Sequence, residues 1–185
     1  MDHGAESYRK FLNGDDDGIV EIIRDYKDGL ILFLNRYVAN IHTAEDLAED
    51  TFFRLVTKKP RFSEKASFKT WLYTIGRNTA VSHLRHSGRI CGQSVEELAV
   101  CISDEEALER SYIREEEKIL LHKTLSNLNA DYSAVLYLKY FEDLSHEQIS
   151  SVLKKNKRQV TNLLYQAKQA LKAELDKEGF HHEEL

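Results

Sequence analysis

The chain of 185 residues contains a single proline, Pro60, and this scarcity of helix-breaking residues constrains its fold more than any other feature. Only eight residues are glycine, whereas Leu, Ala, Glu and Lys, which all favour helices, are frequent. Apolar residues also recur at three- and four-residue steps, as Ile19, Ile22, Ile23 and Tyr26 illustrate. The sequence therefore predicts an all-α protein without strands.

Helical periodicity and capping residues divide the first half of the chain into three predicted helices. Residues 18–38 form one long helix or two consecutive ones, with Gly29 as a candidate break. Residues 44–57 form the next, with Thr43 as its N-cap and an end before Pro60. The third begins after its N-cap Ser67 and ends at Gly88.

The second half carries four further predicted helices, at residues 112–126, 130–141, 145–153 and 157–175. Ser145 is the expected N-cap of the third and Asn156 that of the fourth. A short helix and a long one joined by a few residues have the outline of a helix-turn-helix. We therefore expect two small helical domains, residues 1–88 and 111–178, joined by a flexible acidic linker at 89–110 and followed by a tail at 179–185. The C-terminal domain is the helix-turn-helix.

Charge is segregated along the chain, although its net value is −5. Residues 54–89 hold nine Lys or Arg against one acid, and residues 154–172 hold six bases and no acid. Between these two basic islands, residues 96–117 hold nine acids against two Arg. Because local charge governs contacts with phosphates, a nucleic-acid partner fits the basic islands despite the acidic total.

The cysteines and the first residues of the chain indicate in which cellular compartment the protein is expected. Cys91 and Cys101 lack the paired spacing of a zinc site, and two thiols make a poor disulfide framework, which favours a reduced, intracellular setting. The pair is either a redox switch or, more commonly, incidental. No basic-then-apolar leader begins the chain, and its longest apolar run, residues 29–34, is too short to span a bilayer. We expect a soluble, cytoplasmic protein without membrane insertion.

The predicted helix at 44–57 has two unlike faces. One face is apolar and comprises Ala44, Leu47, Ala48, Phe52, Leu55 and Val56. The other combines three acids with an aromatic ring, at Asp46, Glu49, Asp50 and Phe53. This second face either docks a protein through a hydrophobic anchor with a charged rim, or buries Phe53 under a neighbouring element.

The predicted helix at 68–86 has a stripe expected to be buried, at Phe68, Trp71, Leu72, Ile75 and Thr79. Thr70, Tyr73 and Arg77 fall on the opposite side, with Thr74 and Asn78 along the flank. A stacking ring, a guanidinium and an amide beside a basic loop suit unpaired nucleotides. Ordinary helix packing of the Trp and Tyr rings is the other interpretation.

The last predicted helix also divides into two faces. The buried side comprises Val160, Leu163, Leu164, Ala167 and Leu171. The outward side is uncharged to basic and comprises Arg158, Thr161, Asn162, Tyr165, Gln169 and Lys172. Such a surface suits base edges in its first turns and phosphates farther along.

Three segments in this order resemble the extracytoplasmic-function group of bacterial sigma factors, the small two-domain members of the sigma-70 family. "AEDLAEDTFFRLV" is similar to the polymerase-docking helix and "RFSEKASFKTWLYTIGRNTAVSHLR" to the promoter-melting segment. "LSNLNADYSAVLYLKYFEDLSHEQISSVL" followed by "QVTNLLYQAKQAL" is similar to the C-terminal promoter-binding domain. The resemblance covers nearly the whole chain. It implies a protein that is not an enzyme and that needs no cofactor or metal.

The resemblance also implies partners and site residues. Core RNA polymerase is the first partner, through its β′ coiled coil and β flap, with Asp46, Glu49, Asp50 and Phe53 on the coiled coil. Promoter DNA is the second, and an anti-sigma factor is a further candidate. The positions that match the pocket for a flipped base of the −10 element are Arg54, Lys58, Phe62, Ile75 and Asn78. Tyr73 and Arg77, from the same melting segment, join them as −10 contacts.

The −35 element would be read in the major groove by the last helix. The matching positions are Thr161, Asn162, Tyr165 and Gln166 for bases, with Lys157, Arg158 and Lys168 for phosphates. Two departures from the family are visible. Lys154 and Lys155 occupy turn positions where a small residue or Gly and then an apolar residue are usual, which predicts a turn of different shape. Leu163 and Gln166 stand at positions that are often basic.

Two alternatives come from other classes. One is a helix-turn-helix transcription regulator that does not depend on core polymerase, which leaves the acidic helix face and the melting segment unexplained. The other is a metal-dependent enzyme that uses the tail at 180–185 or His83 and His86. It is disfavoured because the tail is terminal and no acid pairs with the two histidines.

Overall fold

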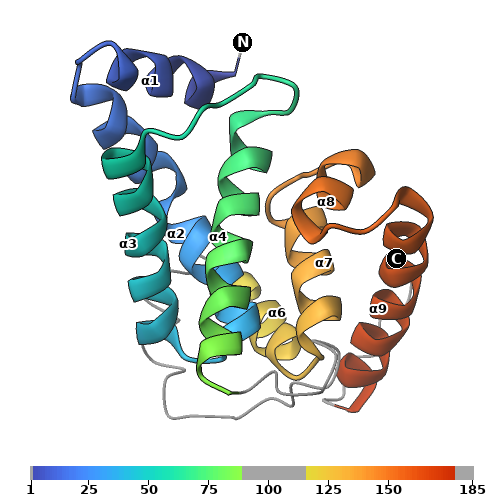
Figure 1. Ribbon diagram of the computed structural model, residues 1–185. Helices are drawn as coiled ribbons and strands as arrows, with labels where there is room; N and C mark the ends of the chain where they lie inside the picture. Colours follow the sequence, from blue (N-terminus) through green and yellow to red (C-terminus); the bar gives the residue numbers. More distant parts are fainter. Residues whose placement is uncertain (1, 89–115, 178–185) are drawn as a thin grey trace.

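The computed structural model describes residues 2–88 and 116–177, with side chains placed from residue 121 onward in the second stretch (Figure 1). These stretches contain helices and no strand, so the all-α prediction is confirmed. The N-terminal bundle comprises α1 (His3–Leu12), α2 (Asp17–Val38), α3 (Ile41–Lys58) and α4 (Phe68–His86). The C-terminal bundle comprises α6 (Glu116–Ser126), α7 (Ala130–Tyr140), α8 (His146–Leu153) and α9 (Lys157–Lys177). The predicted linker and tail lie outside the described residues, and the domain boundaries stay a prediction.

Helix α1 is an element that sequence periodicity missed. Asp2 holds its start in two ways, because one carboxylate oxygen accepts from the Ala5 amide at 3.2 Å and the other from the Phe68 amide at 2.6 Å. Tyr8 and Phe11 are buried against the rest of the bundle. The α1–α2 corner is tight, since a Cβ on Gly18 would lie 2.3 Å from the Ser7 carbonyl oxygen. The first helix is therefore fixed by contacts distant in sequence.

Helix α2 is continuous and runs through the centre of the molecule. It packs against α1, α3 and α4, and also against α7 of the C-terminal bundle. Gly29 does not break it. A Cβ at this position would lie 2.6 Å from a Glu142 carboxylate oxygen and 2.7 Å from the Tyr73 hydroxyl, so the glycine allows the two bundles to approach.

The predicted caps are mostly confirmed. Ser67 caps α4, Ser145 forms a capping box with Gln148 at α8, and Asn156 accepts from the Gln159 amide at the start of α9. Thr43 was the wrong cap for α3. The helix begins earlier, and its Asn40 side chain accepts from the Thr43 amide at 2.7 Å.

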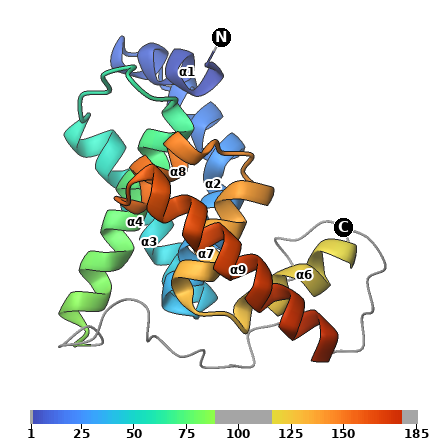
Figure 2. The ribbon, with the colours of Figure 1, turned by 90° about the vertical axis from the view of Figure 1, so that its right-hand side faces the viewer.

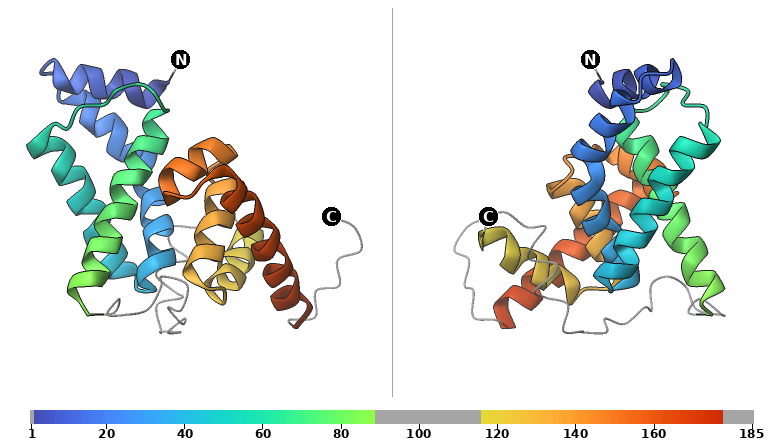
Figure 3. Two further views of the ribbon diagram at one scale, coloured as in Figure 1. Left: turned by 45° about the vertical axis from the view of Figure 1, so that its right-hand side comes forward. Right: turned by 90° about the vertical axis from the view of Figure 1, so that its left-hand side faces the viewer.

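The two bundles pack against each other, α7 on α2 and α8 on α4 (Figures 2 and 3). The rings of Phe33 and Tyr137 stack with centroids 6.3 Å apart, and the Tyr137 hydroxyl donates to the Gly29 carbonyl at 3.1 Å. The buried Arg36 donates to the Ser126 hydroxyl at 3.1 Å. This interface determines which surfaces remain available for partners.

Glu142 is the charged centre of the interface. Its buried carboxylate lies 2.9 Å from the Lys69 ammonium nitrogen, which links the start of α4 to the segment after α7. Burial, and secondarily the Glu142 charge, raise the pKa of both Tyr73 and Tyr137 well above the usual value, so these phenols stay neutral. Beside them, the Gln148 side-chain amide donates to the Ser67 hydroxyl at 3.0 Å.

Candidate docking and nucleic-acid interfaces

The outward side of α3 combines an exposed aromatic ring with three carboxylates. Asp46, Glu49 and Asp50 are exposed, and 66% of Phe53 remains accessible. The described residues therefore provide no element that covers Phe53, and the interpretation that buried it there is wrong. Val56 was expected on the apolar side but is 40% exposed. We call Asp46, Glu49, Asp50 and Phe53 the acidic face.

Helix α4 departs from its predicted burial pattern. Phe68 and Leu72 are buried as expected, whereas Trp71, Ile75 and Thr79 are only partly covered. Thr70 and Tyr73 were expected on the open side, yet each is 1% exposed. The reason is that α4 has neighbours on two sides, with α2 and α3 on one and α8 on the other. In this arrangement Tyr73 cannot stack on a base, and its predicted exposure is wrong.

The loop before α4 is held by aromatic packing. The Phe62 ring lies 5.1 Å from that of Trp71 and 5.7 Å from that of Phe68, centroid to centroid. Tyr8 donates to the Pro60 carbonyl at 2.8 Å, which ties the loop to α1. Phe62 is therefore partly buried and positioned by α1 and α4 together.

The remaining predicted −10 residues lie on two packed helices. Arg54 and Lys58 are exposed in the last turns of α3, while Ile75, Arg77 and Asn78 are partly exposed on α4. Helices α3 and α4 pack side by side, so the two groups come from neighbouring helices of the N-terminal bundle. Arg77 and Asn78, however, line a cavity together with Leu153, Lys154 and Lys155 of the C-terminal bundle.

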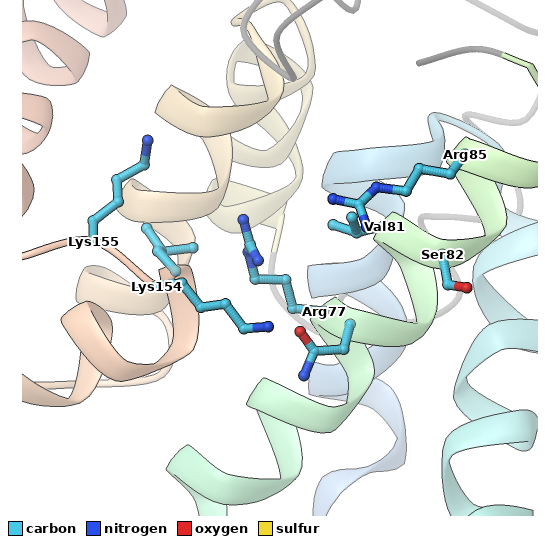
Figure 4. A pocket seen from close by; sticks show the side chains of 8 residues that line it. Arg77, Val81, Ser82, Arg85, Lys154 and Lys155 are labelled. Carbon is cyan, nitrogen blue, oxygen red and sulfur yellow. The ribbon is translucent and has the colours of Figure 1, made fainter. Parts of the chain in front are cut away.

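A cavity of ≈ 540 Å³ separates α4 from the turn between α8 and α9 (Figure 4). Its lining from α4 comprises Arg77, Asn78, Val81, Ser82 and Arg85, and its lining from the other side comprises Leu153, Lys154 and Lys155. Sequence reasoning did not foresee this site. The available signal was that both basic islands contribute to it, but their sequence separation hid their proximity.

The turn between α8 and α9 has lysines at both unusual positions. Lys154 adopts a left-handed backbone with φ 55°, and its amide donates to the Ser150 carbonyl. Lys155 lies over the C-terminal bundle, with its ammonium nitrogen 2.9 Å from the buried Asp131 carboxylate. The turn thus keeps the left-handed position where glycine is usual, and it replaces the usual apolar contact with an ion pair.

The outward side of α9 is open along its length. Val160, Leu164 and Ala167 are buried, whereas Leu163 and Leu171 are partly exposed. The predicted −35 residues are all exposed, namely Lys157, Arg158, Thr161, Asn162, Tyr165, Gln166 and Lys168. Tyr165 is 67% accessible. We call these seven residues the α9 face.

Two cations of the α9 face already have partners. Lys157 pairs with Glu147 of α8, and this lysine lowers the pKa of the Glu147 carboxyl. The Lys168 ammonium lies 5.5 Å from the centroid of the Tyr140 ring. Both interactions are at the surface, where water and salt screen them, so each lysine can exchange its partner for a phosphate.

The part of the chain that the structure describes contains neither a candidate metal site nor a candidate membrane span. No cluster of three or more His, Cys, Asp or Glu there could hold a metal ion, and no helix there is long and apolar enough to cross a bilayer. His83 and His86 are exposed, and the His86 ring nitrogen lies 2.7 Å from the Ser82 carbonyl oxygen. The tail at 180–185 and both cysteines lie outside the described residues.

Comparison with known proteins matches both bundles. Residues 22–90 match the family described as Sigma-70 region 2, and residues 118–171 match Sigma-70, region 4. The chain is 30% identical over 169 residues to the RNA polymerase sigma factor YlaC of Bacillus subtilis, covering 87% of this chain and 94% of the relative. It is 28% identical over 158 residues to the RNA polymerase sigma-H factor of Pseudomonas aeruginosa, covering 81% and 82%.

Two solved structures share the fold. CnrH, in complex with the cytosolic domain of CnrY, superposes with a TM-score of 0.63 at 17% identity, covering 95% of this chain and 96% of that one. The sigma factor RpoE of Bartonella quintana, in complex with the anti-sigma factor NepR, gives 0.62 at 21% identity, covering 90% and 98%. With both bundles matched in order, the chain belongs to the extracytoplasmic-function group of the sigma-70 family, whose members bind core RNA polymerase and direct transcription initiation at promoters.

Proposed function

We propose that the acidic face of α3 is the surface on which core RNA polymerase docks, through the coiled coil of its β′ subunit. The observation that carries this assignment is Phe53, a large exposed ring surrounded by three carboxylates on a helix whose other side is buried. An aromatic anchor within a charged rim is the composition of an interaction hot spot. Region 4 contacts the β flap of the same enzyme.

The α9 face reads the −35 element in the major groove. Asn162 and Gln166 offer amides to adenine edges, Thr161 and Tyr165 flank them, and Arg158 contacts a phosphate. Lys157 and Lys168 also contact phosphates once they release their surface partners, Glu147 and the Tyr140 ring. The full exposure of this face supports the proposal, because no described element has to move before duplex DNA can reach it.

The −10 element is captured by region 2, on the positions Arg54, Lys58, Phe62, Ile75, Arg77 and Asn78. Extruding a base costs a few kcal/mol, which a preformed pocket with nearby cations offsets. Since α8 packs on α4 and leaves Arg77 and Asn78 facing region 4, capture requires the two regions to separate. Tyr73 is 1% exposed and also packs on Phe33 of α2, so it does not contact DNA in this arrangement.

An anti-sigma factor is a second protein partner in this proposal, and the site of action is the cytoplasm, where the polymerase and promoters are. Support comes from the two solved relatives of the same fold, since one was solved with an anti-sigma factor and the other with a cytosolic domain of a second protein.

Co-elution with bacterial core RNA polymerase on a sizing column, at moderate salt and without DNA, tests the proposal. We expect a stoichiometric complex for the natural chain. The double variant Phe53→Ala, Asp50→Lys should bind at least about 30-fold more weakly, because loss of a hot spot costs roughly 2 kcal/mol or more. Val20→Ala, which truncates another exposed apolar side chain, is the matched control and should bind normally.

Unchanged affinity of the double variant would overturn the docking assignment. Absence of any complex, combined with tight binding of the free protein to duplex DNA, would instead favour a helix-turn-helix regulator that acts without polymerase.

A further inference from the structure

We propose that the cavity between α4 and the turn after α8 is a binding site for a compact polyphosphorylated anion. The cavity measures ≈ 540 Å³, within the range of about 300–1,000 Å³ typical of small-molecule sites. Its walls come from regions 2 and 4, so a bound ligand would contact both.

The lining carries four cations and no acid. Arg77 and Arg85 come from α4, and Lys154 and Lys155 come from the turn (Figure 4). Lys155 is neutralised by Asp131, but Arg77, Arg85 and Lys154 form no ion pair with any residue that the structure describes. Three cations without an acidic partner therefore line one cavity from two regions, and a multivalent anion would contact all three.

The Nε atom of Arg77 has no acceptor among the residues that the structure describes. This Nε is buried, and the guanidinium lies close to the hydroxyl of Tyr37, which is itself a donor. Burial raises the pKa of Tyr37, so its phenol stays a neutral donor and does not become a counter-charge for Arg77. Buried donors without acceptors are costly, and phosphate oxygens are the acceptors that a guanidinium fork binds best.

The shape and the rest of the lining narrow the ligand class. Duplex DNA is too wide to enter a cavity of this volume between packed helices. The number of unpaired cations calls for about three negative charges in a small volume, which a chain of two or three phosphates supplies. Val81 and Leu153 add an apolar wall and Asn78 adds an amide, so a nucleoside attached to the phosphates also fits.

The regulatory consequence rests on the function proposed above. A ligand held between α4 and the turn would keep region 4 on region 2 and would cover Arg77 and Asn78. It would therefore compete with capture of the −10 element and leave the acidic face and the α9 face accessible.

Calorimetric titration of the full chain tests the site directly, with inorganic tripolyphosphate, a nucleoside triphosphate and orthophosphate as separate probes. We expect one tripolyphosphate per chain and much weaker binding of orthophosphate. Equal binding of tripolyphosphate and the nucleoside triphosphate would show that phosphates alone are recognised. A tenfold preference for the nucleoside form would show that the apolar wall is used.

Lys154→Gly is the most informative variant, because it removes a lining charge while glycine relieves the left-handed backbone. Affinity for tripolyphosphate should fall about tenfold, with no loss of thermal stability. Lys59→Gly is the matched control, since Lys59 is also a lysine in left-handed conformation, at φ 42°, outside the cavity. It should bind tripolyphosphate like the natural chain. Arg85→Ala should repeat the loss from the other wall.

Equal weakening in Lys154→Gly and Lys59→Gly, or no binding of tripolyphosphate, would overturn the site. If the chain bound a single-stranded oligonucleotide through Lys154 and Arg85 but did not bind tripolyphosphate, the cavity would be a DNA-binding site and the proposal would be wrong. These titrations contain no polymerase, so they succeed or fail independently of co-elution with the core enzyme. In run-off transcription, tripolyphosphate should inhibit the natural chain about tenfold more strongly than Lys154→Gly.

Discussion

The outward sides of α4 and α9, the two helices that we propose to contact DNA, differ in how well the sequence predicts their burial. On α9, every residue predicted to face outward is exposed, because this helix packs on its own bundle along one side only. On α4, Thr70 and Tyr73 were placed outside but are buried, because this helix packs on α8 of the second bundle as well as on α2, where the Tyr73 ring lies 5.2 Å from that of Phe33. Helical periodicity predicts the buried face of a helix whose neighbours all lie on one side, as α6, α7 and α8 do for α9, and it fails where a distant element covers a second side.

The largest effect on this difference is expected from Gly29→Leu. Leucine favours helix more than glycine does, but its Cβ would clash with Glu142 across the interface and with Tyr73 of the neighbouring α4. We expect the contact between the regions to lose about 1–3 kcal/mol and the open form to gain population. Small-angle scattering should show a larger radius of gyration.

Arg24→Leu, at an exposed position of the same helix, is the control for Gly29→Leu and should leave the dimensions unchanged. An unaltered radius of gyration in Gly29→Leu would mean that the interface accommodates the added side chain. The coverage of α4 by the C-terminal bundle would then not depend on Gly29.

A pair of asparagine variants compares the two DNA faces in function. Asn78→Ala should impair promoter opening more than polymerase binding, whereas Asn162→Ala should weaken recognition of the −35 duplex by about 1–3 kcal/mol. Permanganate footprinting measures strand opening, and binding of the holoenzyme to duplexes with altered −35 sequences measures the second effect. Equal loss of polymerase binding and opening in Asn78→Ala would contradict a base pocket on α4.

Alkaline pH should loosen the α4 interface. The pKa values of Tyr73 and Tyr137 are raised in the folded protein, so their stabilising contribution is complete below pH 10.0, the usual tyrosine value. It is lost as the pH rises above 10 toward the folded pKa values. Denaturant titrations from neutral pH upward should show falling stability, and Tyr73→Phe should flatten that fall. An identical pH profile for Tyr73→Phe would argue that other groups cause it.

The smallest effect is expected beside the α9 face. Lys157 lowers the pKa of Glu147 below 4.5, so the ion pair contributes above that pH and is lost as the pH falls through the folded pKa. Both groups are exposed, and the gain is correspondingly slight. Glu147→Gln should therefore remove a small decrease in the free energy of unfolding at acidic pH. It should also release Lys157, which can then bind a phosphate. A large stability change in this variant would mean that the pair organises the turn.

Local chemistry accounts for what could be predicted from the sequence. Ser67, Ser145 and Asn156 cap their helices through amides three residues away, so a short window contains the whole interaction. Likewise, Phe53 could be placed beside three acids on one helix face. The exposure of that face depends on neighbours, and only the structure supplied it.

Contacts distant in sequence account for what was missed. The start of α1 is fixed by the Asp2 carboxylate, which accepts a hydrogen bond from the Phe68 amide. Gly29 does not break its helix but leaves room for the side chains of Glu142 and Tyr73. The cationic cavity needs both basic islands side by side. No helical wheel or composition window contains such pairs, because their members are tens of residues apart.

The hydrogen bond between Gln148 and Ser67 makes the first turns of α4 and α8 a single cooperative unit. Ser67 caps α4 and also receives the side-chain amide of Gln148, whose carbonyl oxygen accepts from the Ser145 amide at the start of α8. Separation of the two regions removes a bond from both helix starts at once. The backbone amides of Thr70 and Gln148 are therefore built-in reporters whose protection from hydrogen exchange should fall together each time the molecule opens.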